Sequence, residues 1–285
     1  DPDYADPYSG LADTHSLMVF YGHAIRDEAM PKAKQHAETA KEKNPNLAKA
    51  YTSMGWILYV YEYDWEGAEN NFKKGVELNP NYATGCQWYG LLLRDIGEKE
   101  EAISIMGRAE QSDPTSLIIK MNLAMMHYQA GLNEKALMYA DEALNISPTF
   151  SLALNMKYVQ LLADGVDGGI EIFRERLSAD KEGNEGRGSL FQLYLMKGER
   201  DAAFEQFTEI VGNPRTTREE CGTMAGMYFR LGKLDLANIW LEIAIENHEP
   251  GLWGYAMGKK YVECQKHPKF IELMKSVNHP LYVDK

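Results

Sequence analysis

Residues 80–114 read PNYATGCQWYGLLLRDIGEKEEAISIMGRAEQSDP and contain the pattern on which the fold depends. Leu91, Leu92 and Ile96 recur at intervals of three and four, which is the spacing of one face of an α-helix. Gly97 follows them, and glycine suits the left-handed turn that ends a helix. The proline that closes the stretch suits the break before the first turn of the next helix. The stretch therefore predicts two helices joined at Gly97.

The same punctuation recurs along the chain with a period of about 34 residues. Prolines lie 35, 34 and 34 residues apart at positions 45, 80, 114 and 148. Glycines lie 34, 34, 33 and 34 residues apart at positions 97, 131, 165, 198 and 232. A period in this range is the mark of a repeat protein, in which each unit buries its apolar face only against its neighbours. A length of 285 residues therefore predicts one elongated domain, 1–285, and not two globular ones.

This pattern resembles the tetratricopeptide repeat. The match is best from Ala83 to Pro114, through Gly90, Leu93, Gly97, Ala102 and Ala109, and from Leu117 to Pro148. The resemblance implies an all-α fold: a right-handed α-solenoid of about seven helix pairs with a C-terminal capping helix. The predicted units are 5–45, 48–80, 83–114, 117–148, 151–182, 184–214 and 217–249, followed by a cap at 250–285.

Two irregularities stand out within this register. The unit from Ala5 to Pro45 is about nine residues too long, and we expect the insertion in its turn region. The unit that ends at Pro80 carries one extra residue before Asp64 and Trp65. The chain also begins at Asp1 and Pro2, where the end of a repeat is expected, so we expect it to be part of a longer protein.

A narrower resemblance concerns residues 61–90, YEYDWEGAENNFKKGVELNPNYATGCQWYG. They are similar to a segment of the C-terminal repeat regions of bacterial winged-helix transcriptional regulators and class III adenylyl cyclases. The phrase around Lys266 to Phe270 is similar to the way those regions end. This resemblance implies a sensory or regulatory region of a larger bacterial signalling protein, and it is compatible with either the periplasm or the cytoplasm.

Composition and missing motifs narrow the chemistry. With 42 acidic and 30 basic residues the net charge is −12, which disfavours direct contact with nucleic acid by this region. No apolar run approaches the roughly 20 residues of a membrane span, so no membrane insertion by this region is expected. There is no GxxxxGK[ST] loop, HExxH or CxxC motif. We therefore expect no catalytic residues, no metal, no cofactor and no enzymatic activity.

What remains is the surface of the inner helices, and the resemblance implies that it forms a concave groove. The ninth and twelfth positions of the repeats project into the groove in the family, and Asn122 is expected on the same side. These candidate residues are Trp56, Tyr59, Leu91, Arg94, Asn122, Met125, Tyr128 and Leu162. The alternative is that some of them pack between neighbouring helices.

A lining rich in aromatic residues, methionine and arginine suits a protein or peptide with apolar or amphipathic anchors. The residues needed for a clamp on C-terminal carboxylates are missing, because Thr52 and Trp56 stand where the family has lysine and asparagine. Two alternatives stay open: a small molecule sensed on behalf of an attached effector such as an adenylyl cyclase domain, and self-association through exposed apolar ends.

Overall fold

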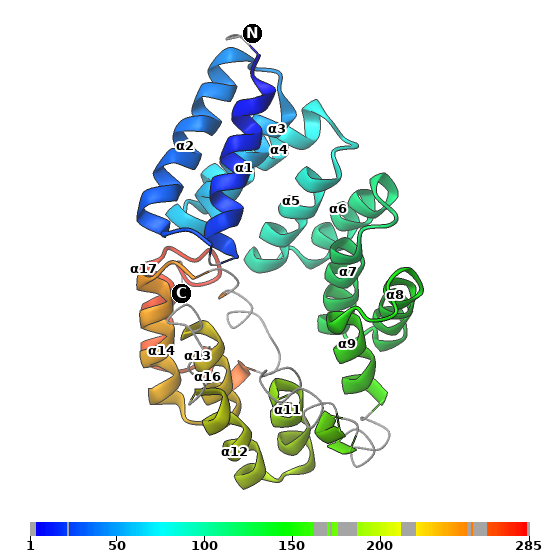
Figure 1. The fold of residues 1–285 in the computed structure, drawn as a ribbon. Helices are drawn as coiled ribbons and strands as arrows, with labels where there is room; N and C mark the ends of the chain where they lie inside the picture. Colours follow the sequence, from blue (N-terminus) through cyan, green and yellow to red (C-terminus); the bar gives the residue numbers. More distant parts are fainter. Residues whose placement is uncertain are drawn as a thin grey trace.

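The computed structural model describes residues 4–21, 23–161, 170–171, 173–175, 187–211, 221–249, 252 and 261–283. In these residues the chain is helical and contains no β-strand, as the all-α prediction requires (Figure 1). The helices of the first five units are α1 (Asp6–Phe20), α2 (Arg26–Lys43), α3 (Ala48–Ile57) with a π-helical turn η1 (Leu58–Glu62), α4 (Trp65–Leu78), α5 (Ala83–Ile96), α6 (Lys99–Ser112), α7 (Leu117–Gln129), α8 (Asn133–Ile146) and α9 (Ser151–Leu161). They are followed by α11 (Arg187–Lys197), α12 (Arg200–Val211), α13 (Cys221–Arg230), α14 (Leu234–Glu246), α16 (Val262–Gln265) and α17 (Pro268–Ser276).

Successive helices pack as pairs, and the pairs stack on one another. The pairs are α1–α2, α3–α4, α5–α6, α7–α8, α11–α12 and α13–α14. The second helix of a pair also packs on the first helix of the next, as α2 does on α3, α4 on α5 and α6 on α7. The predicted α-solenoid is thereby confirmed.

Two glycines of the 80–114 stretch show why the repeat demands this residue. Gly97 ends α5 with a φ of 101°, a left-handed conformation that other residues adopt only with strain. Gly90 lies where α5 crosses α6, and a Cβ there would come within 3.1 Å of the Met106 side chain. Ala102 is buried at the same crossing. Small residues let the paired helices approach closely.

The extra residue in the second unit is absorbed by a π-helical turn. Residues Leu58–Glu62 form η1 at the end of α3, and Tyr63 follows in a left-handed conformation with a φ of 55°. The Asp64 side chain then accepts a hydrogen bond of 2.9 Å from the backbone N–H of Gly67 and caps α4. Single π-helical turns are the usual way in which a helix accommodates one inserted residue, and they occur often at functional sites.

The expected insertion in the first unit is only partly a turn insertion. The connection between α1 and α2 covers residues 21–25, but α2 is 18 residues long where α4, α6 and α8 have 14. A buried stripe of Ala29, Ala33, Ala37 and Ala40 continues along α2. Because this stripe has helical spacing, several of the additional residues lengthen the helix and not the turn.

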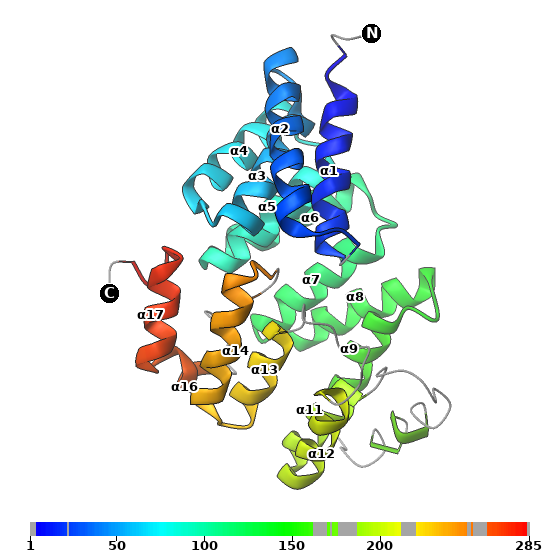
Figure 2. The same ribbon diagram turned by 60° about the vertical axis from the view of Figure 1, so that its left-hand side comes forward.

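The C-terminal helices cover the last pair and return to the second unit (Figures 1 and 2). Phe270, on α17, is fully buried and packs edge to face against Phe229 of α13, with ring centroids 5.8 Å apart. The Trp65 indole N–H donates a hydrogen bond of 2.9 Å to the carbonyl oxygen of Val277. The rings of Tyr63 and His248 stack at 4.9 Å. The solenoid is thus closed on itself by contacts between residues about 200 positions apart.

Candidate functional site

Trp56 and Tyr59 belong to the interior of the molecule. Both were expected to line an open groove, but they are only 3% and 4% exposed. The Trp56 indole stacks on Trp88 with ring centroids 4.6 Å apart, and Phe20 lies 5.5 Å away on its other side. Tyr59 packs between Trp56 and Trp65. In this conformation these side chains offer almost no surface to a ligand, which matches the alternative that the column packs between helices.

A buried polar network lies directly behind this aromatic cluster. The Tyr59 hydroxyl donates a hydrogen bond to the fully buried carboxylate of Asp95, and the Arg94 Nε donates to the same carboxylate over 2.6 Å. Burial and the neighbouring Asp95 carboxylate raise the pKa of Tyr59 well above its ordinary value. Burial alone would lower the pKa of Arg94, but Asp95 outweighs this and raises it. The network therefore holds a neutral phenol, a carboxylate and a permanent cation.

The inner faces of α5 and α7 carry the candidates that remain accessible. α5 and α7 are in contact across the stack. Met125 on α7 is 40% exposed, and Leu91, Arg94 and Tyr128 are half-buried. Asn122 is half-buried too, and its Nδ2 has no hydrogen-bond partner in the part of the chain that the structure describes. Leu162 lies outside the described residues.

Exposure along the ninth-position column rises from one repeat to the next. Trp56 on α3 is buried, Leu91 on α5 is half-buried and Met125 on α7 is exposed. The candidate site is therefore the surface of α5 and α7, which we call the α5–α7 face, with Leu91, Arg94, Met125 and Tyr128 as its accessible side chains. Trp56 and Tyr59 lie behind it and reach it through Asp95.

Sequence reasoning missed the contacts that close the solenoid. Tyr61 and Tyr63 both pack on His248, and Trp65 packs on His279 with ring centroids 5.0 Å apart. The only sequence signal was the extra residue before Asp64, which the structure turns into η1. Asp95 was missed as well, because an aspartate next to an arginine carries no signal of burial.

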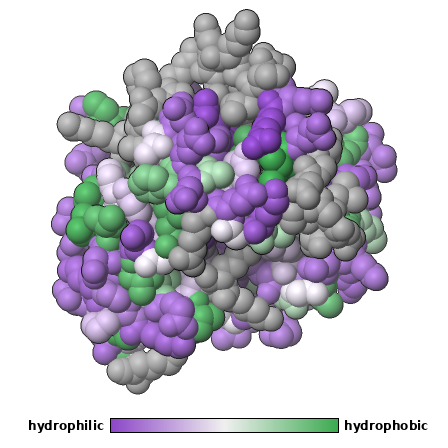
Figure 3. Space-filling model, turned by 90° about the horizontal axis from the view of Figure 1, so that it is seen from below, coloured by the Kyte–Doolittle hydropathy of each residue, from purple (hydrophilic) through white to green (hydrophobic). Residues whose placement is uncertain are grey.

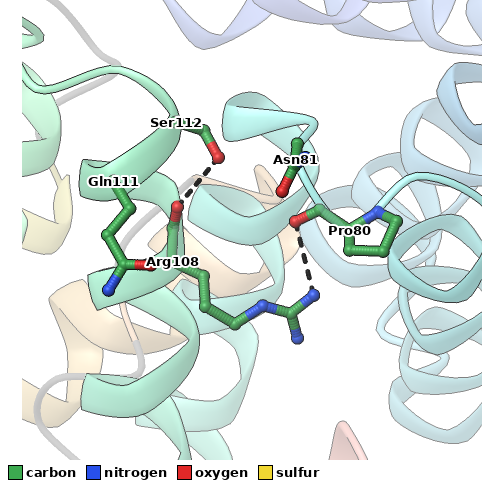
Figure 4. A pocket seen from close by; sticks show the side chains of 5 residues that line it. All are labelled: Pro80, Asn81, Arg108, Gln111 and Ser112. Atoms are coloured by element: carbon green, nitrogen blue, oxygen red, sulfur yellow. Dashed lines mark hydrogen bonds between the residues drawn. The ribbon is translucent and has the colours of Figure 1, made fainter.

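A separate hollow of about 390 Å³ lies outside the α5–α7 face (Figure 4). It is lined by Pro80 and Asn81 of the turn before α5 and by Arg108, Gln111 and Ser112 of α6. The Arg108 guanidinium donates a hydrogen bond of 3.3 Å to the carbonyl oxygen of Pro80 across it. None of the predicted site residues lies in this hollow.

Reactive groups are sparse in the described part of the chain. The three cysteines are free and buried, and burial raises the pKa of each thiol, to about 11 for Cys221 and about 12 for Cys264. Thiols with such values are poor nucleophiles at neutral pH. No group of three metal-ligating side chains occurs among these residues, and none of their helices is long and apolar enough to span a membrane.

The outer surface fits the acidic composition. Seen from below, the described residues form a mainly hydrophilic surface with separate apolar patches (Figure 3). With a net charge of −12, most of this surface disfavours contact with acidic partners. Accessible apolar side chains such as Met125 stand out against it.

Comparison with known proteins places the fold. No protein-family model matches the chain. The chain is similar to the transcriptional regulator HilA of Salmonella typhimurium, with 29% identity over 142 residues that cover 50% of this chain and 25% of HilA. The match thus spans about a quarter of the length of that relative.

Among solved structures, a tetratricopeptide repeat protein from Parabacteroides merdae superposes with a TM-score of 0.60 at 15% identity, over 95% of this chain and 98% of that one. PilW, a type IV pilus biogenesis factor, superposes with a TM-score of 0.58 at 18% identity, over 73% of this chain and 93% of its own. At these identities the likeness shows the fold alone, which is the tetratricopeptide-repeat solenoid. The comparisons do not support the narrower resemblance to winged-helix regulators and adenylyl cyclases.

Proposed function

We propose that this chain is a non-catalytic module that binds a protein or peptide on the α5–α7 face. The observation that carries the proposal is the exposure of Met125 beside the half-buried Leu91 and Tyr128 on two adjacent inner helices. Apolar and aromatic side chains of this kind are enriched at the centres of protein interfaces. A segment with two or three apolar anchors, presented by a helix or an extended strand, matches this surface.

Polar groups at the edge of the face give the ligand its orientation. Arg94 is held by the Asp95 carboxylate, which is itself fixed by the Tyr59 hydroxyl, so the guanidinium is pre-ordered at little entropic cost. The Asn122 Nδ2 is a buried donor without a hydrogen bond among the described residues. An unpaired buried donor costs about 1–3 kcal/mol, so a ligand carbonyl that reached it would recover this loss. Trp56 and Tyr59 support the face from behind.

The test is selection followed by titration. A library of random peptides displayed on phage is panned against the chain, and the peptides obtained are measured by isothermal titration calorimetry. We expect Met125→Glu to weaken binding at least about tenfold, because it places an unpaired charge in an apolar contact. Met138→Glu, on the exposed side of α8, is the matched control and leaves binding unchanged.

Two outcomes contradict this proposal. Either no peptide is enriched, or the peptides bind equally well to the Met125→Glu variant. A thermal-shift screen with small metabolites separates the small-molecule alternative, because a ligand that binds only the folded chain raises its melting temperature.

We propose further that this module is the regulatory region of a larger bacterial signalling protein such as a transcriptional regulator. The match to HilA over 142 residues supports this parentage, and so does the segment at residues 61–90. Reading the coding sequence upstream of Asp1 tests it. A winged-helix or cyclase region there would support the proposal, and an unrelated enzyme would overturn it.

A further inference from the structure

The exposed side of α1 carries no charge. Of the residues from Tyr4 to Tyr21, eight are exposed, and none of them is charged. Seven fall within an arc of about 120° when each residue advances by about 100°. We call them the α1 outer face: Tyr4, Pro7, Gly10, Leu11, Thr14, Met18 and Tyr21. The eighth, Phe20, points away from this arc and packs on Trp56. An uncharged helix face is unusual in a chain of which 25% is charged.

The acidic side chains of α1 are turned toward α3. Asp6 pairs with the Lys49 ammonium at 3.0 Å, and Asp13 accepts a hydrogen bond of 2.6 Å from the Ser53 hydroxyl. The side of α1 away from α3 is left to apolar and small residues. Both ribbon views show α1 at the edge of the stack with no helix on its outer side (Figures 1 and 2).

The repeat register shows what this position normally does. Leu11 is the seventh residue of its unit, and its equivalents are Met54, Tyr89 and Leu123. Leu11 is 43% exposed, whereas Leu123 is 1% exposed and the other two are buried. They are buried because the preceding helix covers them, as Phe72 of α4 covers Tyr89 with ring centroids 6.0 Å apart. The α1 outer face continues this established helix-to-helix interface but lacks the covering helix.

Gly10 adds an independent observation. Glycine inside a helix costs roughly 0.5–1 kcal/mol relative to alanine. Nothing within the molecule requires it, since a Cβ at this position would meet no atom within 4 Å. At Gly90 the missing Cβ makes room for a neighbouring helix. An exposed glycine in the middle of a docking face has the same use when the neighbour belongs to another molecule.

We propose that the α1 outer face binds a second copy of this chain, with the two α1 helices packed antiparallel. The face is symmetric about its midpoint, as an interface between identical copies requires. An antiparallel partner places Tyr4 opposite Tyr21, Pro7 opposite Met18 and Leu11 opposite Thr14, with Gly10 beside the crossing point. Because each copy has a net charge of −12, pairing is tolerated only where the contact surface is uncharged.

Sedimentation velocity on the full chain over a concentration series tests this proposal. We expect a monomer–dimer equilibrium that shifts toward dimer as salt screens the repulsion between the two acidic copies. Leu11→Glu is expected to weaken dimerisation at least about tenfold, because it buries two unpaired carboxylates. Met138→Glu adds the same charge to an exposed methionine on α8 and leaves the dimer unchanged.

Gly10→Ala separates docking from folding. The added methyl group meets nothing inside the molecule and favours the helix, so the monomer melts at a higher temperature, yet it weakens the dimer by separating the two helices at their crossing. A wild-type chain that stays monomeric throughout the concentration series overturns the proposal. So does a dimer that survives Leu11→Glu, because the contact then lies elsewhere. Neither result bears on peptide binding at the α5–α7 face.

Discussion

The two ends of the solenoid treat their outermost apolar surface in opposite ways. At the C-terminal end, α17 covers the last helix pair with Phe270, and Trp65 of the second unit binds the backbone of Val277. At the N-terminal end, α1 presents Leu11 and its neighbours with no helix over them. Every unit of a stacked repeat has two faces to bury, so a terminal unit needs either a cap or a partner. The comparison teaches that this chain supplies one cap from its own sequence.

The largest expected effect concerns the capped end. Phe270→Ala removes a fully buried ring that packs on Phe229 and Tyr282. We expect a loss of about 3–5 kcal/mol in the free energy of unfolding, which is typical of a large-to-small change at a buried aromatic residue. Urea denaturation followed by circular dichroism measures it. A loss below about 1 kcal/mol would show that α17 is not an integral cap.

The two ends are also expected to respond to pH in opposite directions. Burial lowers the pKa of His279, in the C-terminal contact with Trp65, to about 4. The stability that depends on neutral His279 is therefore present above pH 6.5 and is lost as the pH falls toward 4. Burial raises the pKa of Asp13, between α1 and α3, to about 6, although Ser53 and Lys49 oppose the shift. Its contribution is present below pH 3.8 and is lost as the pH rises through 6.

Each of these shifts corresponds to roughly 3 kcal/mol over the full titration range. Hydrogen exchange read by mass spectrometry at pH 4.5 and pH 7, corrected for intrinsic rates, measures the two ends separately. We expect residues 277–283 to lose protection in acid and α1 to gain it. His279→Gln and Asp13→Asn are the controls, since each should abolish the pH response at its own end only. The comparison fails if both ends respond in the same direction.

The smallest expected effect is at the uncovered end. Leu11→Ala in dilute solution should change the stability of the monomer by less than about 0.5 kcal/mol, as for other exposed positions. Leu123→Ala, at the equivalent buried position of α7, should cost about 2–5 kcal/mol. Thermal unfolding of both variants at low protein concentration gives the ratio. Equal losses would mean that Leu11 is covered within the monomer.

Part of the candidate site could be predicted from the sequence. Leu91, Met125 and Tyr128 were expected on the inner helices from the repeat register, and the structure places them on the α5–α7 face. Their binding role stays a prediction. The same register placed Trp56 and Tyr59 in an open groove, where they are buried instead. A repeat pattern says which side of its own helix a residue occupies, but not what lies opposite that side.

The sequence alone determined the helix pairs and the places where they turn. Glycines at intervals of about 34 residues end one helix, prolines precede the next, and small residues set the spacing within a pair, all through contacts within about 40 positions along the chain. Only the tertiary structure decided that the solenoid closes on itself, that η1 provides Tyr61 and Tyr63 for this closure, and that Asp95 is buried. These features arise from the packing of distant segments, such as Trp65 against Val277, and no local period encodes which distant side chains will meet.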